Sequence, residues 1–101
     1  MITTSKTVDD GKNLTVEMCE NGNILCSASA SFFPNYAEIT DITDNEFTVD
    51  MAKSILNIIE LRGIIYVECA LSNIAVKLEI LKFKKEDGIY KLSLINYFKG
   101  C

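Results

Sequence analysis

Hydrophobic and polar residues alternate in the first third of the chain. Leu14, Val16 and Met18 are each separated by one polar residue, which is the period of a half-buried β-strand. Asn21-Gly22 follows, a strong hairpin signal because both residues tolerate a positive φ. The polar residues 1–11 are predicted to be disordered or to begin an edge strand late.

Two more strands are predicted before the first helix. The first, Ile24–Phe33, is rich in Ser and Ala, which indicates that another element packs closely against it. Pro34-Asn35 marks a turn, and the second strand spans Tyr36–Ile42. In this strand Ala37 and Ile39 share one face, and the other face holds Tyr36, Glu38 and Thr40.

The spacing of apolar residues then changes to that of an amphipathic helix. Thr43 and Glu46 have the spacing of a capping box, and Thr48 is an alternative N-cap. Gly63 is a conventional C-terminal stop. The face predicted to be buried carries five apolar residues at helical spacing: Phe47, Met51, Ile55, Ile58 and Ile59.

The last third predicts one strand, one helix and a closing strand. Ile64–Leu71 is a short, β-branched apolar run, typical of a buried central strand. Ser72 is predicted to cap a helix, Lys84–Gly88 to form a turn and Ile89–Phe98 to form a strand. The inner face of this helix is expected to hold Ile74, Ala75, Leu78 and Leu81.

The order of elements, β-β-β-α-β-α-β, predicts a single α+β domain over residues 1–101. Its sheet is expected to be mixed, with helices on its faces. The hydrophobic fraction of 49% fits either a rich core or an apolar surface used in a dimer or partner contact.

Charge and composition narrow the range of partners. The net charge is −4 and Arg62 is the sole arginine, so we expect no binding to nucleic acid or to anionic membranes, both of which need a basic surface. The chain has no apolar run of about 18 residues and begins with a polar segment. A cytoplasmic protein without a membrane span is expected.

Few residues of the chain can carry chemistry. Cys19, Cys26, Cys69 and Cys101 match no zinc spacing and are expected to be free structural thiols, with Cys101 the most prone to artefactual cross-linking. The absence of histidine removes the commonest general base and the familiar serine and cysteine triads. The acidic stretch Asp44–Asp50 lacks the glycine of a calcium loop, so no metal site is expected.

Three segments resemble the acyl-CoA N-acyltransferase (GNAT) family. Ser72–Leu78 reads Ser-Asn-Ile-Ala-Val-Lys-Leu and is similar to the Asn-x-x-Ala start of that family's last helix. Leu81–Tyr90 resembles its Leu-Gly-Phe-Lys segment and closing strand. Tyr36–Asp41 looks like the strand that enters the cofactor site, with a weak similarity to the branch that acetylates β-lysine. The resemblance covers residues 22–94 and implies a truncated GNAT fold without the usual N-terminal strand and helices.

The loop that would hold coenzyme A departs from the family's pattern. In the family, glycines let bare N–H groups at a helix start bind the pyrophosphate. Here Asp44–Met51 reads Asp-Asn-Glu-Phe-Thr-Val-Asp-Met, with three carboxylates and neither glycine nor arginine. The side chains of Thr48, Val49 and Met51 are expected to hold a pyrophosphate away, and the carboxylates to repel it. We therefore predict a degenerate acetyl-CoA site.

The resemblance implies a catalytic set that is only partly present. Glu38 would be the general base, and the backbone of Ile39 and Thr40 would orient the acetyl carbonyl. Asn73 would contact the CoA arm, but it is also an ordinary helix-start residue. Glu38 has an equally simple interpretation as a side chain that faces water. No tyrosine occupies the position of the family's general acid in the last helix.

Other positions also carry two interpretations. Lys82 stands where the family has a glycine. Glu68 interrupts a predicted buried strand, so it either lies at an exposed strand end or pairs with a lysine. Phe32, Phe33 and Tyr36 cannot all point into one core, because neighbours alternate in a strand. Part of this aromatic surface is expected to bind a partner.

Two functions are compatible with these residues. The first is a non-catalytic GNAT-like module without a cofactor, which binds a protein as a regulator or inhibitor, or binds a second copy of itself as a homodimer. The second is an N-acetyltransferase that moves the acetyl group of acetyl-CoA to a small amine or a lysine, with Glu38 as the base.

Overall fold

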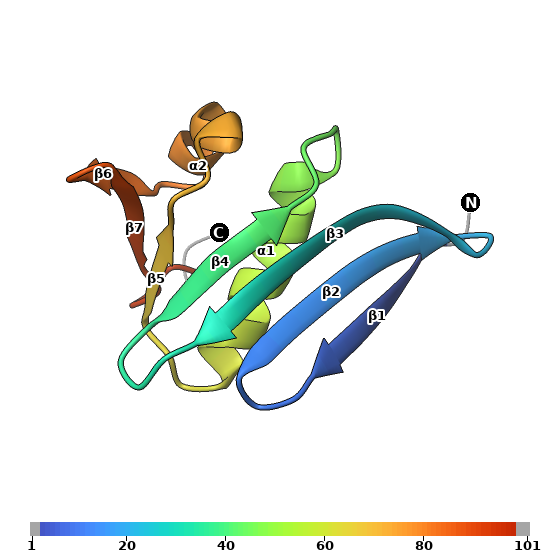
Figure 1. Cartoon of the computed structure of the whole chain (residues 1–101), viewed down its shortest axis with the longest axis horizontal. Helices are drawn as coiled ribbons and strands as arrows, with labels where there is room; N and C mark the ends of the chain where they lie inside the picture. The colour runs from blue at the N-terminus through green and yellow to red at the C-terminus, as the bar shows by residue number, and fades with distance from the viewer. Residues whose placement is uncertain (1–2, 99–101) are drawn as a thin grey trace.

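The computed structural model describes residues 3–98 as a seven-stranded mixed sheet with two α-helices packed on it (Figure 1). The strand order is β1-β2-β3-β4-β5-β7-β6. The strands are β1 (Thr3–Asp9), β2 (Asn13–Glu20), β3 (Asn23–Phe32), β4 (Ala37–Ile42), β5 (Tyr66–Cys69), β6 (Lys84–Glu86) and β7 (Ile89–Ser93). The helices are α1 (Thr48–Leu61) and α2 (Ala75–Ile80), with a 3-10 turn at Ser72–Ile74 before α2.

One parallel strand pair joins two antiparallel halves of the sheet. Strands β1 to β4 pair antiparallel in sequence order, and β5, β7 and β6 form the second antiparallel group. β4 and β5 run parallel through three residue pairs, from Ala37↔Val67 to Ile39↔Cys69. A parallel pair needs a crossover, and α1 supplies it. The two halves therefore meet along a short ladder.

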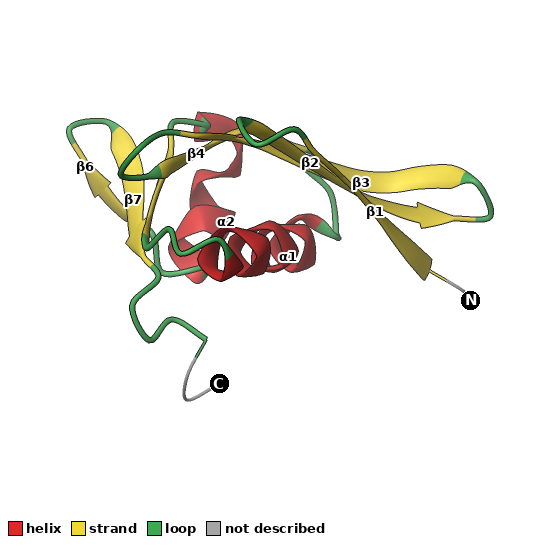
Figure 2. Ribbon diagram, turned by 90° about the horizontal axis from the view of Figure 1, so that it is seen from below, coloured by secondary structure: helices red, strands yellow, loops and turns green. Residues whose placement is uncertain are grey.

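Helix α1 buries the face that the apolar spacing predicts, and it covers one side of the sheet (Figure 2). Phe47 and Ile58 lie at the margin of that face and are half-buried. Ala28 and Ala30 of β3 are small, so the helix can approach the strand closely, as the Ser- and Ala-rich sequence indicates. The fully buried residues of α1 are Thr48, Met51, Ala52, Ile55, Leu56 and Ile59.

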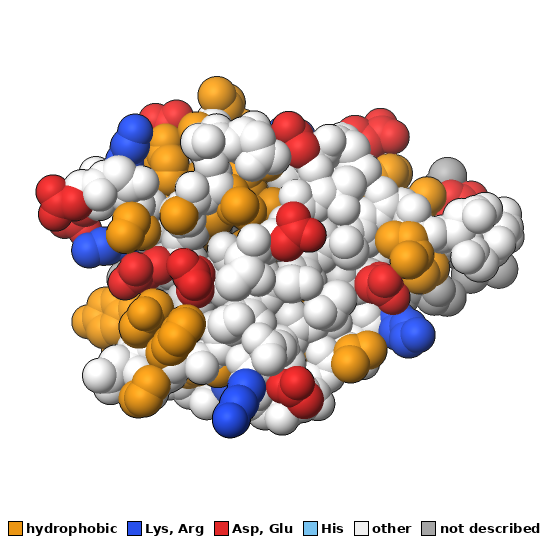
Figure 3. Space-filling view, in the orientation of Figure 1, with side chains coloured by type: hydrophobic (Ala, Val, Ile, Leu, Met, Phe, Trp, Pro, Cys, Tyr) orange, Lys and Arg blue, Asp and Glu red, His pale blue; other side chains and the backbone are white. Residues whose placement is uncertain are grey.

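The opposite face of the sheet carries no helix within residues 3–98. Ser27, Ser29 and Ser31 of β3 point to this open face, because the residues between them are buried on the helix side. Thr15 of β2 shares it, and its hydroxyl lies 3.1 Å from the hydroxyl of Ser29. Figure 3 views this face, whose pale central area consists of small polar side chains and backbone. The open face is thus polar over β2 and β3.

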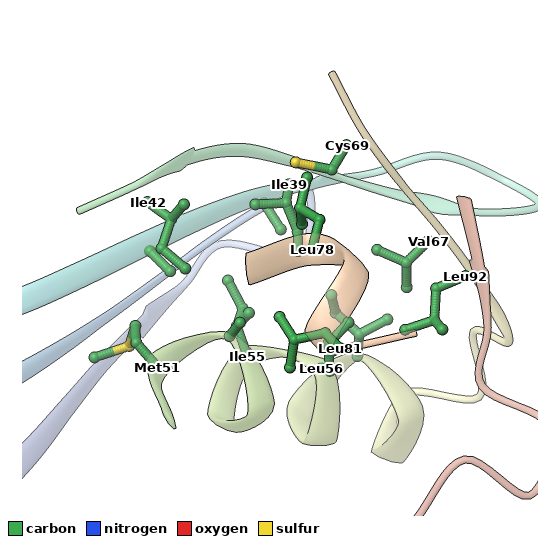
Figure 4. Close-up of a cluster of buried hydrophobic side chains, with 14 of the residues drawn as sticks. Ile39, Ile42, Met51, Ile55, Leu56, Val67, Cys69, Leu78, Leu81 and Leu92 are labelled. Atoms are coloured by element: carbon green, nitrogen blue, oxygen red, sulfur yellow. The ribbon is translucent and has the colours of Figure 1, made fainter. Parts of the chain in front are cut away.

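The core lies between the sheet and the two helices (Figure 4). Leu78 of α2 and Leu81, just after this helix, fill the space between the strands and α1, and each is at most 2% exposed. Val67 of β5 and Leu92 of β7 line the end of the core beside them. Burial of one large aliphatic side chain contributes about 1.5–3 kcal/mol, so this layer is the main source of stability.

The N-terminal segment is an edge strand. Of the two interpretations of residues 1–11, disorder is wrong for Thr3–Asp9, which pair with β2 along their whole length. The expectation that the N-terminal strand is lacking is wrong for the same reason. Asp10 fixes the turn to β2, since its carboxylate accepts the N–H groups of Lys12 and Asn13 at 2.9 and 2.7 Å. Pairing with β2 and the turn at Asp10 thus form this strand, although its sequence has no apolar periodicity.

The C-terminal elements are shorter and more numerous than predicted. The turn consists of Asp87-Gly88 alone, with φ of 52° and 81°, and the rest of Lys84–Gly88 forms the charged edge strand β6. Strand β7 ends at Ser93, although the prediction extends it to Phe98. The residues of β6 are all charged and exposed, as is common on edge strands. A short charged run of this kind cannot be told from a turn in the sequence.

Two further predictions need adjustment. Strand β5 is central, as predicted, but it spans four residues, and Tyr66 at its start is 51% exposed. Ser72 begins the 3-10 turn and forms no capping hydrogen bond with its side chain. Gly63 ends α1 as predicted, with a φ of 85°.

The described cysteines are free thiols. Cys26 and Cys69 are buried, and burial raises the pKa of both thiols, whereas Cys19 is half-buried. Cys101 lies outside the described residues. In the part of the chain that the structure describes, no helix is long and apolar enough to cross a membrane, and no group of three or more acidic or cysteine side chains is arranged to hold a metal ion.

Lys82 ends α2 in a left-handed conformation that L-residues rarely adopt. Its φ is 77°. The N–H groups of Lys82 and Phe83 donate to the carbonyls of Glu79 and Leu78, both at 3.0 Å. This is the Schellman arrangement that glycine usually completes, and a side chain there costs about 1–2 kcal/mol.

Lys82→Gly is expected to raise the free energy of unfolding by about 0.5–1 kcal/mol, because relief of the left-handed strain exceeds the added entropy of the unfolded chain. Urea unfolding measures the change. Lys53→Gly on the exposed side of α1 is the matched control and should lower the free energy of unfolding by about 1 kcal/mol. Equal losses in the two variants would show that Lys82 is not strained.

Candidate functional site

The parallel pairing of β4 with β5 stops at Ile39 and Cys69, and the two strands diverge beyond it (Figure 1). Helix α2 lies at the opening between their ends. Its Leu78 side chain points toward Ile39 and Cys69, and all three are at most 2% exposed (Figure 4). Apolar side chains therefore fill the helix side of this opening.

A β-bulge lies at the same point of β4. The register with β3 places Ile39 opposite Ala30 but Asp41 opposite Ser29, which leaves Thr40 as the extra residue. The hydroxyl of Thr40 donates to the carbonyl of Ser29 at 3.3 Å. The bulge bends β4 where it leaves β5.

The loop that follows, residues Thr43–Phe47, forms several of its own hydrogen bonds and is called the α1 loop. The side-chain oxygen of Asn45 accepts the N–H of Phe47 at 2.8 Å, and the hydroxyl of Thr48 accepts the N–H of Asn45 at 2.7 Å. The same hydroxyl donates to the carbonyl of Thr43 at 2.6 Å. The predicted caps are therefore wrong: Phe47 is the N-cap residue, and Asn45 supplies the accepting side chain.

Lys77 of α2 crosses to the α1 loop. Its ammonium donates to the carboxylate of Asp44 at 2.5 Å and to the carbonyl of Asn45 at 2.8 Å, and it lies 3.4 Å from the hydroxyl of Thr48. Three contacts use all three donors of an ammonium. The side chains of Lys77 and Asp44 are 30% and 43% exposed, so this ion pair lies at the rim of the core. It joins the start of α1 to α2.

The first turn of α1 presents few side chains to solvent. The prediction that Thr48 and Met51 project toward a bound anion is wrong, because both are at most 1% exposed and face the core. Val49 is half-buried, and Asp50 is exposed. The helix start therefore presents exposed carboxylates, and the N–H groups of Val49 and Asp50 have no acceptor among the described residues.

The residues that the resemblance implies for catalysis come from two elements. Glu38 is half-buried on the open face of β4, and Ile39 points into the core. Thr40 is exposed at the bulge. Asn73 is exposed in the turn before α2. No hydrogen bond joins Glu38 to Asn73 in the described structure.

The aromatic residues near Pro34 divide between two environments. Phe32 packs against the core, and the guanidinium of Arg62 lies over its ring at 4.4 Å. Phe33 and Tyr36 stack on each other, with centroids 4.8 Å and planes 12° apart, and Phe33 is 40% exposed. A shallow groove of about 380 Å³ lies beside them, between the β3–β4 turn and the start of β5.

Four charged side chains form a line across the open face, which we call the charged row. Glu38 on β4 is opposite Glu68 on β5, Glu68 is opposite Lys91 on β7, and Lys91 is opposite Lys84 on β6. None of the four takes part in an ion pair with another described residue. Glu68 lies opposite Lys91 in the register, but the interpretation that it pairs with a lysine is not borne out, because the two form no ion pair. A groove of about 520 Å³ runs beside the row, between β5, β7 and β6.

The fold is similar to those of several solved structures, although no protein-family model matches the chain and no curated protein matches it in sequence. The ribosomal-protein-S18-alanine N-acetyltransferase of Escherichia coli has a TM-score of 0.68 and 15% identity, over 85% of this chain and 72% of that chain. A protein described as an acetyltransferase of the GNAT family, from Desulfovibrio desulfuricans, has a TM-score of 0.67 and 13% identity, over 82% and 69%.

A third structure extends the comparison. The PaiA N-acetyltransferase of Thermoplasma acidophilum, in complex with coenzyme A, has a TM-score of 0.65 and 12% identity, over 81% of this chain and 61% of that chain. These similarities confirm the GNAT fold, in a form truncated relative to its neighbours. Identities this low show the fold and not the reaction. The similarity to the β-lysine branch stays a prediction.

Lys77 could not be found from the sequence as a site residue. It lies 33 residues from Asp44, and no local pattern connects them. The role of Asn45 could have been predicted from the sequence. An asparagine before a helix commonly forms a turn in which its side-chain oxygen accepts the N–H two residues later. The charged row depends on strand register, which single-sequence periodicity does not fix.

Lys77→Met is expected to lower the free energy of unfolding by about 1 kcal/mol, because Asp44 and the carbonyl of Asn45 lose their donor while the aliphatic stem is kept. Chemical unfolding measures the loss. Lys53→Met on the exposed side of α1 is the matched control and should change it by less than about 0.5 kcal/mol. Equal effects would show that the Lys77 contacts do not hold the loop.

Proposed function

We propose that this protein is a small GNAT-fold module that works by binding a protein partner and does not use acetyl-CoA. The observation that carries the proposal is the contact of Lys77 with Asp44 and Asn45. This contact joins α2 to the start of α1. The resemblance implies that a pyrophosphate would bind at that helix start.

A pyrophosphate would have to compete with groups already bound at the start of α1. The N–H groups of Asn45 and Phe47 donate within the loop, and an anion site at a helix start depends on free N–H groups. Glu46 and Asp50 are exposed carboxylates in the same region and would repel an anion. Loss of one charge-assisted hydrogen bond costs about 1.5–3 kcal/mol, or roughly ten- to hundred-fold in affinity.

A binding role is supported by apolar side chains exposed at one end of the sheet. Phe33 and Ile65 are each 40% exposed, and Tyr66 is 51% exposed. Tyr36 stacks on Phe33 and extends this surface. Aromatic side chains are enriched at the centres of protein interfaces. Of the three predicted partner-binding residues, Phe33 and Tyr36 suit this role, and Phe32 supports the core below them.

The proposal includes a cytoplasmic location and a protein partner, with neither nucleic acid nor membrane bound. The free thiols of Cys19, Cys26 and Cys69 suit a reducing compartment. A net charge of −4 with a single arginine suits neither a phosphate backbone nor an anionic membrane surface.

The alternative is an N-acetyltransferase that transfers acetyl from acetyl-CoA to a small amine or a lysine. The observation in its favour is the edge of β4, which has no partner on the β5 side beyond Ile39. The resemblance implies that the backbone of Ile39 and Thr40 would orient the acetyl carbonyl there. Glu38 would take the proton of the amine, and Asn73 would contact the CoA arm.

Calorimetric titration of acetyl-CoA and of coenzyme A into the reduced protein tests the proposal. We expect no binding up to about 1 mM ligand, because the carboxylates of Glu46 and Asp50 repel an anion and the N–H groups of Asn45 and Phe47 already donate within the loop. Micromolar binding of either ligand would contradict the proposal and favour the enzyme.

If acetyl transfer to a polyamine or a lysine peptide is detected, two variants test whether Glu38 of this protein is the general base of the reaction. Glu38→Gln should lower the rate by about a hundred-fold if Glu38 is the base. Glu86→Gln, an exposed carboxylate on β6, is the control and should leave the rate unchanged. Equal rates in the two variants would exclude Glu38 as the base.

A further inference from the structure

The charged row reads acidic, acidic, basic, basic across four neighbouring strands. Its order is Glu38, Glu68, Lys91 and Lys84. Neighbouring strands lie about 4.8 Å apart, so the row spans about 14 Å. Like charges stand side by side at both ends, an arrangement that destabilises a sheet. No ion pair with another described residue relieves either end.

The charges of this row are complementary to those of a second copy of the row that runs in the opposite direction. A two-fold axis between β5 and β7, parallel to the strands and in the plane of contact, would set the row against a second copy in the opposite order. Glu68 would then face Lys91 of the partner subunit, and Glu38 would face Lys84 of the partner subunit. Contacts of this kind are isologous, the commonest form in homodimers.

Apolar side chains flank the row on the same face. Tyr66 lies two residues before Glu68 in β5, so alternation places it on the open face, and Tyr36 directly precedes β4. Phe33 stacks on Tyr36. In Figure 3, hydrophobic side chains gather at one end of this face beside acidic and basic ones. An apolar area with charges at its border is the ordinary composition of an interface.

We propose that the open face over β4, β5, β7 and β6 binds the same face of a second copy, to form a two-fold symmetric dimer. The inference rests on the proposed binding role and names its partner. Tyr66 lies next to the axis, so the two copies of this side chain would pack at the centre. Charge complementarity fixes the orientation, since the reverse orientation would set Glu against Glu and Lys against Lys.

Sedimentation equilibrium tests the dimer with the whole chain, between about 5 and 500 μM and at low and high salt. We expect a monomer–dimer equilibrium whose dissociation constant rises at least about tenfold between 50 and 500 mM NaCl, because salt screens the row.

Two charge-reversed proteins sharpen the test. Glu38→Lys with Glu68→Lys makes the row wholly basic, and Lys84→Glu with Lys91→Glu makes it wholly acidic. Each should be monomeric alone, whereas an equimolar mixture should form a heterodimer. Glu17→Lys with Glu20→Lys on β2 makes the same change of charge away from the row and should leave the dimer intact.

A wild-type protein that stays monomeric at every concentration would overturn the dimer, as would a dimer that survives both reversals. The proposed function fails by a different result, since acetyl-CoA binding would overturn it whatever the oligomeric state. Monomeric protein without acetyl-CoA binding would leave the binding role in place and remove the self-association.

Discussion

The structure depends on the short parallel ladder between β4 and β5. Three residue pairs join the half of the sheet formed by β1 to β4 to the half formed by β5, β7 and β6. The side chains that secure the ladder, Ile39, Val67 and Cys69, are at most 2% exposed and pack against the helices. Because pairing ends after three residues, the strands diverge, and α2 can lie at the opening with Leu78 toward both of them. The position of α2 in turn lets Lys77 reach the start of α1.

The start of α1 can be held by contacts that an anion site does not need. The GNAT fold needs a helix after β4 to connect the parallel strands, and that requirement is met by apolar packing alone. An anion site at the same helix start needs free N–H groups and little negative charge. In this chain Asn45, Thr48 and Lys77 bind within the loop, and Asp44 is held by the lysine. The fold is therefore compatible with loss of the cofactor site, because neither set of contacts requires the other.

Sequence patterns predicted the elements whose side chains alternate or repeat. The buried face of α1, the hairpin at Asn21-Gly22 and the central position of β5 follow from apolar spacing and turn chemistry. The sequence leaves β1 open between disorder and an edge strand and predicts a turn for β6, because both are polar edge strands held by ladder hydrogen bonds and not by burial. The contact of Lys77 with Asp44 and the charged row depend on tertiary position and register, which no local pattern in one sequence encodes.

In the proposed function, the carboxylates and the internal hydrogen bonds of the α1 loop keep coenzyme A away from the start of α1, where the N–H groups of Val49 and Asp50 have no acceptor among the described residues. Amide NMR of the labelled protein with about 1 mM coenzyme A tests it at the residues concerned, Val49, Asp50 and Lys77. The account predicts unchanged amide resonances at Val49 and Asp50 and an unchanged side-chain ammonium signal of Lys77. Saturable shifts of all three, with the rest of the spectrum unmoved, would contradict it and place a pyrophosphate at this helix start.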